Sequence, residues 1–186
     1  MRNAFGKSSV SLAFIVLIVS SALVVGAGLP SYMTVMGSKQ GQIKGEVTKA
    51  GREDTILVIG FSHEVVSPRD AASGLPTGKR QHKPIVITKK IDKSTPLLMN
   101  ALVNNENLDV EVSVYGATSG RKEMLCYTIQ LTNAAVAGIK QYMGFNATTL
   151  ITGDHLEEVS FTYQKIIWTY EDGGITAEDD WETPVV

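Results

Sequence analysis

The sequence has little of several residue types on which particular classes of protein depend. Among 186 residues it has one cysteine, Cys126, six prolines and three histidines. One cysteine cannot form an intramolecular disulfide, so a disulfide-stapled scaffold is excluded, and we expect Cys126 to be an inert, partly buried thiol. Six prolines exclude a proline-rich linker. The formal net charge of −2 argues against a strongly basic nucleic-acid-binding protein.

Patterns typical of catalytic and metal sites are also missing. His63, His82 and His155 lie far apart, without the spacing of zinc ligands. No Gly-x-Ser-x-Gly sequence marks a nucleophilic serine. The run at 74–80 resembles a phosphate-binding loop but lacks the Ser or Thr that binds magnesium. The sequence therefore predicts no catalytic residues, no metal site and no cofactor.

The N-terminal region is apolar and uncharged over twenty residues, 10–29. Two basic residues precede this stretch, and small residues end it at 25–27. This pattern is typical of a secretory signal peptide, which we assign to residues 1–27. A retained membrane anchor is an alternative, because twenty apolar residues can span a bilayer, and membrane contact would then be confined to this segment. A third possibility is that translation starts near Met33.

The rest of the chain alternates between apolar and polar residues with a period of two, which is typical of strands. The clearest run is 108–114, where apolar residues stand at every second position. About seven or eight such segments without intervening helices predict a mainly β fold, a sandwich or a barrel. The other predicted strands are 32–36, 55–66, 84–91, 124–132, 136–142 and 156–170.

The last predicted strand changes phase near its middle. Its apolar residues move to the other parity after Gln164 and Lys165. A bulge or sharp bend at this point would let one strand serve two faces. The alternative is an edge strand that is buried on both faces at its end.

One segment has helical spacing. Thr95 is a suitable cap, Pro96 suits the first helical position, and Asn104 and Asn105 suit the exit. A helix of about two turns is not stable alone in water, so it must lie against the sheet. We expect the residues that pack it there to be Pro96, Leu97, Leu98, Ala101 and Leu102.

A long connection at 67–83 and an acidic end at 175–186 carry no strand pattern. Long loops without secondary structure are uncommon, and they are usually functional or disordered. The acidic end also contains Trp181. We interpret it as a disordered tail, with the alternative that Trp181 docks on a neighbouring molecule. The long connection closes with a basic cluster: Gly78, Lys79, Arg80, Gln81, His82 and Lys83.

Several of these segments together resemble one family. They are Gly45–Glu46, 56–61, 78–84, 89–98 and the closing run 158–170. Over residues 32–174 the chain is similar to Hcp, the haemolysin-coregulated tube protein of type VI secretion systems. The resemblance implies a small two-sheet β-barrel in residues 28–174, with one short α-helix on its side.

The resemblance also implies a structural, non-enzymatic role. Family members form hexameric rings that stack into a tube, which a contractile sheath drives outward behind a spike, and the lumen carries effector proteins. The connection at 67–83 matches the extended loop through which subunits meet, so Gly78–Lys83 are candidate subunit-interface residues. We expect Lys79, Arg80 and Lys83 to meet acids of the neighbouring copy, and one strand to face the lumen. The acids are Asp154, Glu157 and Glu158; the lumen-facing residues are Asp109, Glu111 and Ser113.

The N-terminal segment departs from the family, whose tubes assemble in the cytosol. If residues 1–27 are a signal, the protein is an exported, ring-forming relative that builds an extracellular filament or surface assembly. If the start is misassigned, assembly is cytosolic and precedes secretion. A secreted β-sandwich enzyme or binding module is a further alternative.

Overall fold

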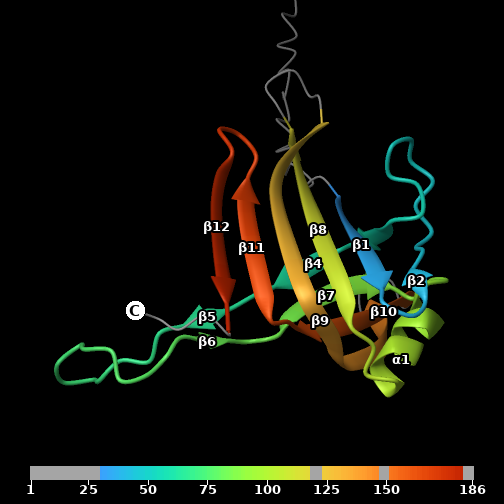
Figure 1. Ribbon diagram of the computed structural model, residues 1–186. Coiled ribbons are helices and arrows are strands. Elements are labelled where there is room, and N and C mark those ends of the chain that lie inside the picture. The colour runs from blue at the N-terminus through green and yellow to red at the C-terminus, as the bar shows by residue number, and fades with distance from the viewer. Residues whose placement is uncertain (1–29, 118–122, 147–150, 182–186) are drawn as a thin grey trace, which may run out of the picture.

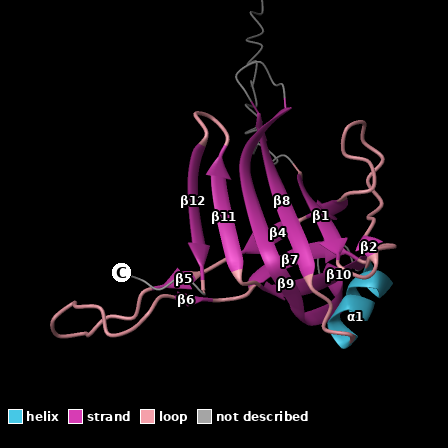
Figure 2. Ribbon diagram, viewed as in Figure 1, coloured by secondary structure: helices cyan, strands magenta, loops and turns pink. Residues whose placement is uncertain are grey.

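The structure is a computed structural model that describes residues 30–117, 123–146 and 151–181. It is mainly β with one short helix, α1 (Thr95–Val103), at one end of the sheets (Figures 1 and 2). The strands in chain order are β1 (Ser31–Gly37), β2 (Gly41–Gln42), β3 (Ile56–Val58), β4 (Gly60–Ser62), β5 (Val65–Val66), β6 (Gln81–His82), β7 (Ile85–Lys90), β8 (Leu108–Ala117), β9 (Glu123–Asn146), β10 (Ile151–Thr162), β11 (Lys165–Tyr170) and β12 (Ile175–Asp180).

All strand pairs are antiparallel, and the main path runs β2-β1-β8-β9-β10-β7-β4. The long strand β9 replaces the two strands predicted at 124–132 and 136–142. Its first half pairs with β8 and β11, and its second half pairs with β10. Asn133 has φ 51° at the changeover, which is a conformation that Asn tolerates. One continuous strand therefore belongs to both layers of the fold.

The predicted phase change of the last strand is confirmed. β10 ends at Thr162 and β11 begins at Lys165, and the two strands pair with different halves of β9. Phe161 before the break and Ile166 after it are both fully buried. Because the break shifts the parity, residues of opposite phase face one shared core.

The expected closure into a barrel is not found. β3 pairs with β1 and β4 pairs with β7, and Ile59 between them donates its N–H to Thr88 O at 2.9 Å. Each of these two ladders is three residues long, so the contact between the two layers at this side is short and split. The sheets therefore pack face to face without closing into a barrel.

The core lies between the two layers and is built from their inward-facing alternate residues. Met33, Val35, Val112, Ile87 and Val159 have no exposed surface. Burying an aliphatic side chain of this size contributes about 1.5–3 kcal/mol, so these rows hold the layers together.

Helix α1 closes the end of this core. Its cap is Ser94, not Thr95 as expected from the sequence, because Thr95 is buried and already lies inside the first turn. Asn104 follows the last turn as the C-cap, and Asn105 has φ 46°. Leu98 and Ala101 are buried and Leu102 packs against the core, whereas Pro96 and Leu97 are exposed. The stripe that contacts the sheet is therefore narrower than predicted.

Two regions expected to be irregular are ordered. The connection at 67–83 forms most of a hairpin that projects from the body, with β5 and β6 paired at its base (Figure 1). Residues 175–180 form β12, which pairs along its whole length with β11. The interpretation of this part as a disordered tail is therefore wrong. β12 was missed because Ile175 and Ala177 are its only apolar residues, so its sequence resembles a solvated acidic run; it forms a strand because it pairs with the preceding strand, β11.

The N-terminal segment 1–29, with its predicted signal or anchor, lies outside the described residues. Within the described part of the chain, no helix is long and apolar enough to cross a membrane.

Candidate assembly surfaces

The projecting hairpin, which we call the arm, comprises residues 63–83. Its hydrogen bonds join one limb to the other: Asp70 N–H bonds Leu75 O at 2.9 Å, and Thr77 N–H bonds Pro68 O at 3.0 Å. At the tip the Asp70 carboxylate accepts the N–H groups of Ala72 and Ser73 at 3.2 and 2.7 Å. The arm is thus shaped by its own backbone. Leu75, near the tip, is 65% exposed and is therefore accessible to a partner.

The basic cluster predicted from the sequence lies on the returning limb of the arm. Gly78, Lys79, Gln81 and Lys83 are exposed. Arg80 instead bends back to β12, where its guanidinium forms a bidentate pair with the Asp179 carboxylate and donates to Asp180 O at 2.8 Å. The guanidinium holds the pKa of Asp179 below its usual value, and the carboxylate raises the pKa of Arg80.

His82 is packed into the base of the arm. Its Nε2 lies 2.6 Å from Asp179 Oδ2, and its Nδ1 lies 2.9 Å from Tyr163 Oη. His63 reaches the same hydroxyl from the other side, with Nε2 at 2.7 Å. Burial raises the pKa of Tyr163 to about 12, with a smaller contribution from the negative charge of Asp179. Both limbs of the arm and the break between β10 and β11 therefore meet at one hydroxyl, and β12 joins them through the bond between His82 and Asp179.

Both tryptophans of the chain lie against these imidazoles. The Trp168 ring is stacked on His82 with centroids 6.3 Å apart, and it lies 6.0 Å from His63. Trp181 lies 5.4 Å from His82. Trp181 thus contacts the arm of its own chain; the alternative expectation was a neighbouring molecule.

The acids expected to meet the basic cluster from a neighbouring copy have partners within their own chain. Glu157 is fully buried and pairs with Lys89, so no neighbour can reach it. Glu158 pairs with Lys140 at 3.6 Å, and Asp154 pairs with Lys90 at 3.0 Å. The expected pairing is therefore wrong for Glu157, because its carboxylate is buried in an ion pair with Lys89. Arg80 pairs with a carboxylate of its own chain, Asp179 of β12.

The buried pair of Lys89 and Glu157 organises the segment beneath α1. Lys89 Nζ lies 2.6 Å from Glu157 Oε1 and 2.9 Å from Asp92 Oδ1. The Thr95 hydroxyl donates to Glu157 Oε1 at 2.8 Å, and Gln141 donates to Glu157 Oε2 at 3.0 Å. This network gives a physical role to the segment 89–98, on which the sequence resemblance partly rests: it fixes the start of the helix to both β7 and β10.

An exposed apolar row runs along the joint of β3 and β4. Leu57, Ile59 and Phe61 are 39, 50 and 41% exposed and stand at alternate positions, so they share a face. They line a groove of about 420 Å³ together with Pro30 and Ser31. An apolar row of this kind on a folded chain is typical of a protein–protein contact.

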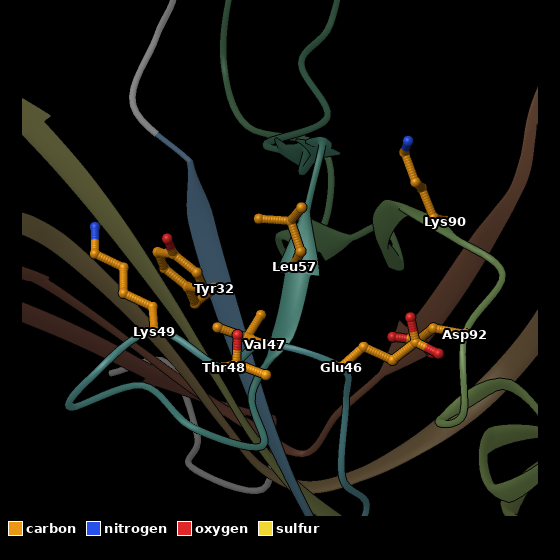
Figure 3. Close-up of a pocket in the computed structure, with 8 residues that line it drawn as sticks. All are labelled: Tyr32, Glu46, Val47, Thr48, Lys49, Leu57, Lys90 and Asp92. Atoms are coloured by element: carbon orange, nitrogen blue, oxygen red, sulfur yellow. The ribbon is translucent and has the colours of Figure 1, made fainter.

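A second groove, of about 360 Å³, lies beside the same strand between the segment 46–49 and the turn after β7 (Figure 3). Its lining mixes two cations, Lys49 and Lys90, with two anions, Glu46 and Asp92, around Leu57. Because the positive and negative side chains are equal in number, the groove favours neither anionic nor cationic ligands. Within the described residues, no group of three or more His, Cys, Asp or Glu side chains is placed to hold a metal ion.

The outward face of β1, β8 and β9 is mainly polar, with Met36 of β1 as an exposed apolar residue opposite Asp109. Asp109 is exposed, and Glu111 and Ser113 are half-buried on the same side of β8. Gln130 of β9 donates to Glu111 at 3.0 Å. This face therefore presents carboxylates and amides, as we expected for strands that border water.

Sequence reasoning missed three residues that hold the arm. Tyr163, Trp168 and Asp179 come from elements that the structure alone brings beside His82. The one available signal was the parity change after Gln164, which separates the apolar positions of Tyr163 and Trp168. Asp179 stood in a run of acids that resembles a solvated tail.

These features can be compared with known proteins. The family profile described as "Type VI secretion system effector, Hcp" matches residues 32–170. The "Major exported protein" of Pseudomonas aeruginosa is 43% identical over 167 residues, which are 84% of this chain and 97% of that protein. Two solved structures have the same fold. A crystal structure of an Hcp protein is 34% identical with TM-score 0.75, covering 82% of this chain and 99% of that one. The secreted protein Hcp3 from Pseudomonas aeruginosa is 38% identical with TM-score 0.67, covering 83 and 99%.

The fold and the matched relatives define an exported protein of type VI secretion. The chain belongs to the Hcp family and is a tube protein of that system.

Proposed function

We propose that the chain is a structural, non-enzymatic subunit of the type VI inner tube, in which hexameric rings stack and carry effector proteins through their lumen. The observation that carries this proposal is the match to the Hcp family over residues 32–170, nearly all of the described chain. Contacts with the sheath and the spike follow from the same role.

The geometry supports a ring built from unlike surfaces. A closed ring needs a heterologous interface, in which one patch meets a different patch of the next copy. The arm offers the exposed Leu75, and the joint of β3 and β4 offers Leu57, Ile59 and Phe61. These two apolar surfaces belong to different elements. Gly78, Lys79, Gln81 and Lys83 on the arm are the candidate polar contacts of the same interface.

The polar outward face of β8 supports a water-filled lumen. Asp109, Glu111 and Ser113 present groups that water solvates well, and the exposed Met36 of β1 lies opposite Asp109 on the same face. A lumen lined in this way passes a folded, polar cargo without binding it tightly, because exposed charges contribute little net binding energy.

The assembly is tested by native mass spectrometry and negative-stain imaging of the purified protein. We expect a sixfold subunit mass and open rings. A monomer at micromolar concentration would remove the structural role and favour a binding module.

The second candidate is an exported ring-former that builds an extracellular filament or surface assembly. The uncharged stretch 10–29 with two basic residues before it favours this candidate. Sequencing the N-terminus of the protein recovered from the medium distinguishes the two. A first residue of Gly28 supports signal-dependent export, and a first residue of Met33 supports cytosolic assembly.

A further inference from the structure

Two histidines share one phenol at the junction between the arm and the body. Tyr163 Oη lies 2.7 Å from His63 Nε2 and 2.9 Å from His82 Nδ1. Tyr163 is 8% exposed, and the His82 side chain is 2% exposed. With so little water present, each of these hydrogen bonds must be satisfied by the protein itself.

Hydrogen-bonding rules decide where the protons lie at neutral pH. A carboxylate only accepts, so His82 Nε2 carries the hydrogen that faces Asp179 Oδ2. In neutral His82 the other nitrogen, Nδ1, is then an acceptor, and Tyr163 donates its hydroxyl hydrogen to it. The Tyr163 oxygen in turn accepts from His63 Nε2–H. The result is one continuous chain of bonds from His63 to Asp179.

This chain can take up one proton and remain satisfied. A proton on His63 Nδ1 leaves every bond within the chain unchanged. A proton on His82 Nδ1 turns the Tyr163 hydroxyl toward His63, which accepts it as the other neutral tautomer. When a second proton binds, no arrangement of these hydrogen bonds satisfies every group. Both imidazolium rings then direct an N–H at the same phenol oxygen, and the phenol hydrogen loses its acceptor.

The charges around the site add to this constraint. The groups that face the histidines are Arg80 from the arm, Asp179 and Asp180 from β12, and the Tyr163 phenol from the break between β10 and β11. Arg80 and Asp179 already form a bidentate pair, so Asp180 is the one further carboxylate among these groups that could balance two imidazolium charges. The His63 and His82 ring centroids are 6.4 Å apart, within the range of strong repulsion at low dielectric.

We propose that His63, Tyr163 and His82 form a proton-sensitive latch that holds the base of the arm to β12 while at most one histidine is charged, and releases it when both are charged. This inference concerns a single chain and does not depend on the proposed function.

The direction of the titration agrees with this geometry. Burial lowers the pKa of His63, and the charge of His82 lowers it further. A histidine whose folded-state pKa is lowered contributes stability above its unfolded value of about 6.5, and that stability is lost as the pH falls below it. The latch is therefore closed at pH 7.5 and opens toward pH 5. Asp179 stays ionised over this range, because Arg80 holds its pKa below the usual value.

The test measures hydrogen–deuterium exchange of the full chain at one protein concentration between pH 7.5 and pH 5.0, corrected for the intrinsic pH dependence of exchange. Peptides covering 79–83 and 175–181 report the two sides of the latch. We expect their corrected exchange to rise on acidification, about tenfold for each unit by which the pKa of His63 lies below 6.5. Tryptophan fluorescence is a second measure, because both tryptophans lie against the imidazoles.

Two variants make the outcome specific. His63→Gln keeps a partner for the Tyr163 hydroxyl but cannot be charged, so exchange in these peptides should stay flat with pH. His155→Gln is the matched control, because His155 is the third histidine of the chain and is exposed on β10; it should behave as the wild type. A rise that persists in His63→Gln, or that disappears in His155→Gln, would overturn the latch. If His63→Gln does not fold, the wild type decides alone: corrected exchange that is flat between pH 7.5 and 5.0 overturns the proposal.

Discussion

Lys89 and Glu157 form an ion pair of 2.6 Å in which neither side chain has any exposed surface. Charges are rarely removed from water so completely unless every polar atom is paired. Here Thr95, Asp92 and Gln141 complete the network. The pair therefore sets the position of α1 relative to two strands, β7 and β10.

The first prediction removes the cation of this pair. Lys89→Met leaves the Glu157 carboxylate buried without its cation, which we expect to lower the free energy of unfolding by about 3–5 kcal/mol. Lys90→Met is the control, since Lys90 is the next residue and its partner Asp154 is exposed. Urea denaturation measures both. Adding Glu157→Leu to Lys89→Met should recover much of the loss, because an apolar pair replaces a buried ion pair at little cost. Equal stability of Lys89→Met and Lys90→Met would show that the buried pair contributes nothing.

The second prediction concerns Gly45, one of the residues on which the sequence resemblance rests. A Cβ at this position would lie 2.2 Å from the backbone oxygen of Thr55, which cannot move without displacing β3. We expect Gly45→Ala to destabilise the fold by about 2 kcal/mol or more. Gly138→Ala is the control, because a Cβ there has no heavy atom within 4 Å. Thermal denaturation of the two variants gives the comparison, and a Gly45→Ala protein as stable as Gly138→Ala would contradict the close approach.

The third prediction follows from the lowered pKa of Asp179. A carboxylate with a lowered folded-state pKa contributes stability above its usual value of 3.8, and that stability disappears as the pH falls through the lowered value. The wild type should therefore be more stable than Asp179→Asn at neutral pH, and the difference should shrink as the pH falls from 5 toward 3. Glu178→Gln is the control, because Glu178 is 62% exposed. Urea denaturation across this pH range measures the difference; the same difference at both ends would rule out the Arg80 pair as its source.

The fourth prediction tests the arm as a contact between copies. Leu75 is exposed near the arm tip, so Leu75→Ser should change the stability of the fold by no more than about 0.5 kcal/mol. If Leu75 is a hot spot of the interface, its truncation costs more than about 1 kcal/mol of binding, and the ring would lose this contact at every interface. Val103→Ser is the control, because Val103 is 73% exposed at the end of α1. Sedimentation velocity should show fewer rings for Leu75→Ser alone; equal ring fractions in the two variants would exclude this contact.

Much of the fold could be predicted because it depends on local patterns. The alternation at 108–114 predicted β8, and the parity change after Gln164 predicted the break between β10 and β11. Thr95–Pro96 and the two asparagines at 104–105 gave the extent of α1, although the cap proved to be Ser94. Each of these features is decided within a few residues, where periodicity and capping have their effect.

The arm base could not be predicted, because its partners are brought together only by the fold. Arg80 and His82 were singled out as basic residues, but their carboxylate, Asp179, lies about one hundred residues further along and stands in an acidic run. The same holds for Lys89, whose partner Glu157 was expected to meet the basic cluster of a neighbouring copy. The residue type alone does not show whether a carboxylate is buried or solvated, because burial is set by the folded structure.

The sequence by itself determined the class of the protein, mainly β with one helix, because this class follows from periodicity, and it indicated the Hcp family through local segments such as Gly45–Glu46 and 89–98. The tertiary structure alone decided that the sheets stay open, that the acidic end is a strand, and that two histidines share one tyrosine at the base of the arm. The physical reason is that the energies of strand pairing and of buried hydrogen bonds depend on the partner rather than on the residue itself. For the open sheets and the shared tyrosine these partners lie far apart in the chain, whereas β12 is set by its neighbour β11.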